Sequence, residues 1–340
     1  MKHIGKALII AGALSLCGCV FLGLGTGMLY EEWRNSKSQS NTEYEEKQYS
    51  TPVNGISTIQ TDIAWDNVVI EPGKGDQIEI IYQDKIDEPR YQISENNGTL
   101  QIVQKPSYGF SLFNIPDLRL GWDNEEKVNM TIYVPESYAG TYDLDLSSGS
   151  MSVQDLVIKE ELEVYATSGI IKLDNLTCEK DAEVEISSGS VTIENLEVQG
   201  ELTCRFTSGL ISARELTVEG DMKVRGSSGS INMEDIIVVG DLDCDLTSGR
   251  IVSKTVSAEA VSATASSGTI ILDELTVGKG IEAFVTSGTV RVTLTDDISN
   301  YRINSDVTSG HCSLPGNFGN GDKYIDVEVT SGNVDFTFAE

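Results

Sequence analysis

The sequence predicts an all-β protein built as a single-stack β-solenoid, with about 20 residues per coil and three short strands in each coil. Three observations lead to this prediction: Ser-Gly recurs at a nearly constant spacing, apolar and polar residues alternate between the recurrences, and the same residue types return at the same place in each repeat. A period of roughly 20 to 50 residues is the signature of stacked repeats. A two-residue alternation is typical of half-buried strands.

The N-terminal segment predicts one transmembrane helix. Residues 1–30 comprise a short cytoplasmic tip and a run, residues 7–30, that contains no charged residue and is long enough to cross ~30 Å of hydrocarbon as a helix. Two lysines precede the run and two glutamates follow it, so the positive-inside rule predicts a single-pass cell-membrane protein with a cytoplasmic N-terminus and an extracellular body. A cleaved signal peptide and lipidation of Cys19, in a lipobox-like sequence, are the alternatives, and the length of the apolar run disfavours both.

Two segments connect this anchor to the repeats. Residues 31–50 are rich in Ser, Asn, Glu and Lys, which is typical of a flexible linker. Residues 51–145 lack the strict spacing but show strand-like alternation and turn sequences, and we expect them to form an irregular β region that caps the first coil. Such a cap protects the open sheet edge of a terminal repeat.

The most apolar stretch outside the anchor lies within this capping region, at residues 108–122. One interpretation is a plug that covers the first coil. The other is an exposed hairpin that contacts a partner or the bilayer surface, with Phe110, Phe113 and Trp122 as the candidate contact residues.

The Ser-Gly glycines set the period of residues 146–340, the predicted solenoid. They follow each other at five intervals of 20 residues and then at 19, 20, 22 and 22. Glycine tolerates the positive φ of a tight bend, so we expect each one to form a structural corner. The glycines are Gly149, Gly169, Gly189, Gly209, Gly229, Gly249, Gly268, Gly288, Gly310 and Gly332.

The alternation inside one repeat predicts the strands. The second residue after each glycine is apolar, as in Ile171 and Val191, and further apolar positions recur later in the repeat. We expect these side chains to point inward and to stack on their equivalents in the next coil. At the far end, Phe336 and Phe338 are expected to close the last coil.

Composition limits the partners. The chain holds 24 basic and 53 acidic residues, a net charge of −29, which makes nucleic acid and anionic lipid headgroups poor partners. Outside the anchor the cysteines are too few and too scattered for a disulfide framework, so we expect buried free thiols. These cysteines are Cys178, Cys204, Cys244 and Cys312.

An acidic row is the one candidate for a metal site. Its residues occupy the same outward position in successive coils, where opposed like charges destabilise a sheet and a bound Ca²⁺ or Mg²⁺ would relieve the repulsion. A solvated face explains the same pattern, and the Gly-Gly-x-Gly-x-Asp motif of calcium-binding β-rolls is absent. The sequence therefore predicts no metal and no cofactor. The row is Glu161, Asp181, Glu201, Asp221 and Asp241.

The sequence gives little support for a catalytic role. The only histidines are His3 and His311, so the serines of the corners lack the base that a nucleophilic serine needs, and we expect their hydroxyls to bond turn backbones. A polysaccharide-active β-helix enzyme is the enzymatic alternative, because clustered carboxylates can supply acid and base. The acids are spread evenly along rows, so the sequence predicts a protein that is not an enzyme.

Several stretches together resemble a known family. They are the N-terminal membrane segment, residues 56–82, 98–102 and 132–135, and the Ser-Ser-Gly-Ser coils. In these the chain is similar to the bacterial "putative adhesin" domain family of unknown function, which includes LiaG-like membrane proteins associated with envelope-stress loci. The resemblance covers about residues 51–340 and implies the architecture. It implies no catalytic residues, because the family has none that are agreed.

The functional expectation follows from these points. We expect a membrane-anchored extracytoplasmic β-solenoid that acts as a non-enzymatic surface scaffold or adhesin-like interaction module in the bacterial envelope, with an envelope protein or wall polymer as its partner. An accessory or sensor subunit of an envelope-stress signalling or transport system is the alternative. The sequence does not indicate the oligomeric state.

Overall fold

The computed structural model of the protein describes residues 44–86, 89–105 and 129–339. These residues form 27 strands joined in one sheet, and the chain from Tyr44 onward is one compact unit. The single helix among them is the short 3-10 turn Ile298–Asn300. No helix in the described ranges has the length and apolarity needed to cross a membrane, and the predicted anchor at residues 7–30 lies outside them. The all-β solenoid prediction is confirmed.

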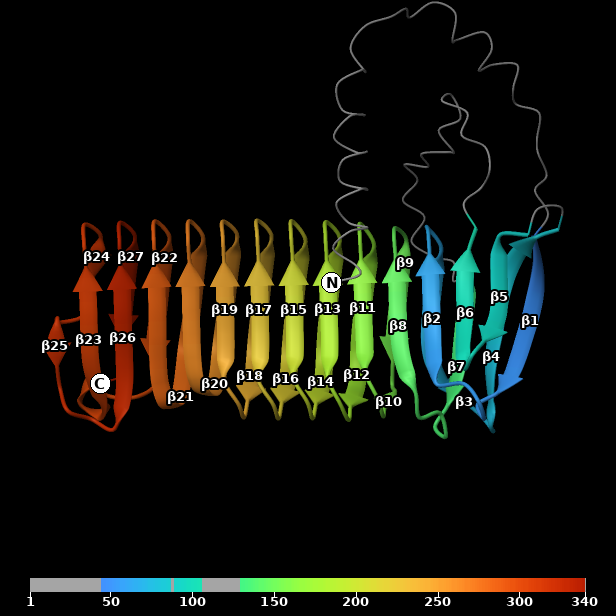
Figure 1. The fold of residues 1–340 in the computed structure, drawn as a ribbon, viewed down its shortest axis with the longest axis horizontal. Coiled ribbons are helices and arrows are strands. Elements are labelled where there is room, and N and C mark those ends of the chain that lie inside the picture. Colours follow the sequence, from blue (N-terminus) through green and yellow to red (C-terminus); the bar gives the residue numbers. More distant parts are fainter. Residues whose placement is uncertain (1–43, 87–88, 106–128, 340) are drawn as a thin grey trace, which may run out of the picture. The chain divides into compact units, whose positions relative to one another are not determined.

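The regular coils stack in register, each strand pairing in parallel with its equivalent one repeat later (Figure 1). Leu162, for example, lies opposite Ala182, which lies opposite Leu202. The strands of one side are β11 (Leu162–Ala166), β13 (Ala182–Ile186), β15 (Leu202–Phe206), β17 (Met222–Gly226) and β19 (Leu242–Leu246). Those that follow the Ser-Gly corners are β12 (Ile170–Cys178), β14 (Ser190–Val198), β16 (Leu210–Val218) and β18 (Ser230–Val238).

The prediction of three separate strands per coil is wrong in one respect. The first two predicted strands join into one nine-residue strand, bent at a single left-handed residue such as Asn175 in β12, where φ is 54°. The residues on both sides of it, Asp174 and Leu176, keep their partners in the next coil, so this corner is too short to interrupt the ladder. The equivalent bend residues are Asp155, Asn195, Glu215, Asp235, Thr255 and Glu274.

The Ser-Gly glycines lie in corners, but mostly for a reason other than a positive φ. Among them only Gly149 has a positive φ, 85°. Elsewhere the corners stack so closely that a side chain would not fit: a Cβ built on Gly209 would lie 2.9 Å from the carbonyl oxygen of Gly189. Close backbone approach between coils therefore requires glycine there.

The N-terminal coils stack out of chain order. β2 pairs in parallel with β8 on one side and β6 on the other, and β3 pairs likewise with β9 and β7. The coil formed by β2 and β3 therefore lies between two coils that follow it in the sequence. The strands are β2 (Thr58–Ile63), β3 (Asn67–Gly73), β6 (Thr99–Gln104), β7 (Met130–Pro135), β8 (Thr141–Leu146) and β9 (Ser150–Gln154).

The parallel stack thus begins well before residue 146, where the sequence places the boundary between cap and solenoid. The Ser-Gly period does not reveal its earliest coils, because their corners have other sequences. Their inward residues, such as Ile59 and Ile63, nevertheless alternate with outward ones as in the later coils. Antiparallel strands close this end: β4 on β7, β1 on β4 and β5 on β6. They are β1 (Tyr44–Pro52), β4 (Gln77–Lys85) and β5 (Tyr91–Asn96).

The C-terminal end shows the same exchange of order. β26 lies between β21 and β23, and β27 lies between β22 and β24 (Figure 1), so the last coil of the chain is not the last coil of the stack. The strands are β20 (Arg250–Ala265), β21 (Thr269–Val285), β22 (Thr289–Leu294), β23 (Tyr301–Val307), β24 (His311–Cys312), β25 (Asn317–Phe318), β26 (Lys323–Val329) and β27 (Asn333–Thr337).

The expectation that Phe336 and Phe338 close the stack is therefore wrong. Phe336 belongs to β27, inside the stack, and the terminal coil carries the short antiparallel strand β25. Inward residues explain the order: Ile325, Val327 and Val329 of β26 are fully apolar and buried, whereas β23 carries Ser305 at the matching position. Burial of apolar side chains stabilises the fold, so the more apolar coil takes the inner place.

The core is one continuous hydrophobic interior that runs through the coils. Cys178, Cys204 and Cys244 lie in it as the buried free thiols that the sequence predicts, whereas Cys312 is free but only half-buried. Burial raises the pKa of the first three thiols to about 12.

Candidate functional site

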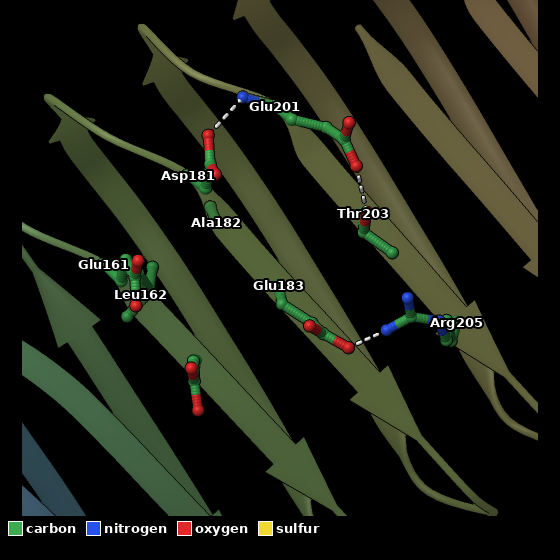
Figure 2. A pocket seen from close by; sticks show the side chains of 9 residues that line it. Glu161, Leu162, Asp181, Ala182, Glu183, Glu201, Thr203 and Arg205 are labelled. Carbon is green, nitrogen blue, oxygen red and sulfur yellow. Dashed lines mark hydrogen bonds and ion pairs between the residues drawn. The ribbon is translucent and has the colours of Figure 1, made fainter. Parts of the chain in front are cut away.

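The outward faces of the coils carry the candidate site, and the acidic row lies along one of them. Asp181 Oδ1 accepts a hydrogen bond from the backbone N–H of Glu201 at 2.8 Å, and Asp221 Oδ1 accepts one from Asp241 at 2.9 Å (Figure 2 shows the first). Each aspartate also lies against the glycine of the next coil, as Asp181 does against Gly200. In every second coil the aspartate carboxylate thus accepts the hydrogen bond of a backbone N–H group in the corner of the next coil.

The remaining acids of this row have partners or face solvent. Glu201 accepts from Thr203 Oγ1 at 3.1 Å and pairs with Lys223. Within the described ranges no three His, Cys, Asp or Glu side chains are grouped so as to hold a metal ion. Geometry therefore gives Asp181 and Asp221 of this row a structural role in the coil corners.

Beside the acidic row, ion pairs between coils join β13 to β15 and β17 to β19. Arg205 pairs with Glu183, as Figure 2 shows, and Arg225 lies 3.7 Å from Asp243. A shallow hollow of about 250 Å³ lies between the pair of Glu183 and Arg205 and the acidic row. Because the side chains of these pairs are roughly half exposed, each pair adds little stability.

A second outward face is formed by the first halves of β14, β16, β18 and β20. It contains a hollow of about 440 Å³ lined by the in-register side chains of Thr192, Ser212 and Asn232 and by a charged row beside them. Arg214 Nε donates to Glu234 at 3.2 Å, and this contact lowers the pKa of the Glu234 carboxyl.

Toward β12 the charged row continues with Asp174, and Lys172 lies beside it in register with Thr192. Lys172 Nζ lies 2.9 Å from Asp174 and 3.2 Å from Glu194, and these hydrogen bonds raise the pKa of the Lys172 ammonium. The charges of this face are therefore tied to one another across coils, and the row of hydroxyl and amide groups beside them stays open to solvent.

A buried polar cluster at the N-terminal end was not predicted. Arg90 Nη1 lies 2.9 Å from Asp66, the Arg90 backbone N–H donates to Asp84 Oδ1 at 2.7 Å, and the Tyr91 hydroxyl donates to Asp66. Burial, with this hydrogen bond, raises the pKa of Tyr91 well above its usual value. No repeat or motif joins these residues in the sequence, so only the non-local packing of β3, β4 and β5 could reveal them.

Among the described residues the structure brings no serine hydroxyl to a histidine base. His311 Nε2 lies 3.6 Å from Asp335, and among the described residues no serine hydroxyl is hydrogen bonded to this imidazole. Ser309 instead donates to the Thr330 carbonyl at 3.0 Å, as expected for a corner hydroxyl. The predicted contact residues Phe110, Phe113 and Trp122, and Cys19, lie outside the described ranges.

Comparison with solved structures finds several similar chains. A "putative adhesin" from Bacteroides fragilis is 15% identical, with 87% of this chain and 98% of that chain covered and a TM-score of 0.38. A "putative cell adhesion protein" from Clostridium sporogenes is 13% identical, with 87% and 100% covered and a TM-score of 0.21. A "putative lipid binding protein" from Parabacteroides distasonis is 16% identical, with 88% and 98% covered and a TM-score of 0.33.

A comparison with proteins of curated function finds no match. A family model does match: the Toastrack DUF4097 model covers residues 56–253 and again 220–337. These ranges hold almost all of the strands described above, including the regular Ser-Gly coils. The chain therefore belongs to the Toastrack DUF4097 family.

Proposed function

We propose that the protein is a membrane-anchored, extracytoplasmic scaffold or interaction module of the bacterial envelope and that it is not an enzyme. The observation that carries this proposal is the in-register stack. Because every outward position returns one coil later in the same orientation, outward side chains recur at a spacing of ~4.8 Å along each face. Such a surface is suited to an extended partner rather than to a single small substrate.

Membrane attachment is supported by the chain that precedes the stack. The uncharged run at residues 7–30 is long enough to span a bilayer, and about a dozen residues separate it from the start of β1 at Tyr44. A short tether of this kind would hold the stack close to the extracellular surface of the cell membrane. We expect removal of residues 7–30 to release the protein into the soluble fraction.

A non-enzymatic role is supported by the chemistry of the faces. The hollows on them are shallow, most of their charged residues are paired across coils, and in the described part of the chain no serine hydroxyl is hydrogen bonded to a histidine. In the acidic row, Asp181 and Asp221 accept hydrogen bonds from corner backbones instead.

Cross-linking in intact cells tests the proposal. The tagged full-length protein is cross-linked, purified under denaturing conditions and analysed for attached protein and wall polymer. The scaffold proposal is supported if either is captured and if the protein is found in the membrane fraction, but no longer after deletion of residues 7–30. Capture of one stoichiometric membrane complex that survives wall digestion favours the accessory or sensor subunit instead. A cytoplasmic location, or polysaccharide cleavage abolished by one carboxylate substitution, would overturn the proposal.

A further inference from the structure

The face formed by the first halves of β12, β14, β16, β18 and β20 differs from the rest of the protein in its charge balance. The protein carries a net charge of −29, yet the outward charged residues of this face are three acids and four bases. They are Asp174, Glu194 and Glu234, and Lys172, Arg214, Arg250 and Lys254. Five of the seven are held in ion pairs, and the face as a whole carries an excess of one positive charge.

Next to the charged row, three uncharged polar side chains line the hollow of about 440 Å³. Thr192, Ser212 and Asn232 lie opposite one another in successive coils. Within the described residues none of the three side chains has a hydrogen-bond partner, in contrast to the carboxylates of the acidic row. They form a ladder of free donors and acceptors with a repeat of ~4.8 Å along the stack.

The opposite edge of this ladder carries an apolar group. The Leu210 side chain is 41% exposed, and its in-register neighbours in the coils before and after are Ser190 and Ser230. Leu210 therefore stands out between two small polar residues, on the same face as Ser212. An apolar contact beside a row of hydroxyl and amide groups matches the surface of a sugar ring, which has hydroxyls at its rim and C–H groups on its face.

We propose that this face binds an uncharged polysaccharide chain that lies along the stack, across the strands. Thr192, Ser212 and Asn232 hydrogen bond its hydroxyls, and Leu210 packs against a ring. An anionic polymer finds an excess of only one positive charge here and meets repulsion from the strongly acidic remainder of the protein. A cationic polymer is drawn instead to the acidic row. The inference rests on the proposed interaction role and names the polymer class for it.

Binding of the full-length protein to an array of uncharged and anionic polysaccharides tests the inference. The variant Ser212→Ala/Asn232→Ala removes two hydrogen-bonding groups, and we expect it to weaken binding to the uncharged polymer by about tenfold or more. The matched control is Thr177→Ala/Thr217→Ala, which removes two outward threonine hydroxyls from the second halves of β12 and β16. We expect the control to bind as the unchanged protein does.

Three results would overturn the inference: no binding to any uncharged polysaccharide, preference for the anionic ones, or equal loss in the two variants. Circular dichroism of both variants checks that the stack is intact. If cells still yield a cross-linked envelope protein while the array shows no binding, the polysaccharide inference fails and the scaffold proposal stands. If neither experiment finds a partner, both fail.

Discussion

The ring of Phe206 fills the space that a side chain at Gly226 would need. The two residues are in-register partners in β15 and β17, and a Cβ built on Gly226 would overlap three ring atoms of Phe206. The bulkiest inward side chain of its row is thus accommodated by the absence of a side chain in the next coil. Close packing in protein interiors makes such volume exchanges between neighbours necessary.

Gly226→Ala is therefore expected to destabilise the fold by about 1–3 kcal/mol, because overpacking forces strain into a filled core. Denaturant unfolding measures the loss. The double variant Phe206→Leu/Gly226→Ala should recover part of it by making room. Gly316→Ala is the control, since a Cβ there meets nothing within 4 Å. Equal effects of the two alanine substitutions would contradict the packing argument.

The buried ion pair between Arg90 and Asp66 is expected to be essential for the N-terminal end. Arg90→Met leaves Asp66 and Asp84 buried without this partner, which typically costs about 3–5 kcal/mol. Lys172→Met breaks an ion pair whose lysine side chain is 44% exposed, so its cost should stay below about 1 kcal/mol. Thermal unfolding of the two variants compares them. Similar small losses would show that the buried pair is dispensable.

The exchanged coil order at the C-terminus can be tested with one matched pair of substitutions. Val329 and Val307 are direct neighbours in β26 and β23, but Val329 is 1% exposed and Val307 is 36% exposed. Val329→Ala should cost about 2 kcal/mol and Val307→Ala clearly less, as measured by denaturant unfolding. A stack in simple chain order would place Val307 inside, and the two results would be reversed.

The buried thiols give a pH dependence of defined sign. Burial raises the pKa of Cys204 from 9.0 to about 12, so between these values the folded state holds the proton more tightly than the unfolded state. The stability contribution is complete below pH 9 and is lost as the pH rises from 9 toward about 12. Unfolding midpoints measured across this range should fall less steeply when Cys178, Cys204 and Cys244 are replaced by alanine. An unchanged slope would contradict the effect.

The regular middle of the fold could be predicted from the sequence because its contacts repeat. Each inward residue, such as Ile171, packs on an equivalent residue 20 positions on, so a period in the sequence is directly a contact in space. A polar residue also recurs at the position of Asn175 in successive repeats, which is typical of a corner. That it stays within one strand could not be seen, because a single left-handed residue leaves the pairing on both sides intact.

The order of the coils at the ends of the stack and the side-chain contacts at the sites could not be predicted from the sequence, for physical reasons. The corner glycines Gly310 and Gly332 fit either order of the last coils, and the order depends on which inward side chains are more apolar as a set. The pair Arg90 and Asp66 comes from segments with no repeat between them. The acidic row was recognised, but whether Asp181 turns to solvent, to a metal or to the Glu201 backbone depends on side-chain geometry alone.

The inner position of the last coil also limits how this protein can have grown during evolution. A copy of β26 and β27 appended at the C-terminus would meet the already occupied coil of β23 and β24 rather than a free edge. New coils can be gained without disturbing the ends only in the middle, where one ladder simply becomes longer. There, from Gly149 to Gly249, the spacing is a constant 20 residues, as tandem duplication within the stack would leave it.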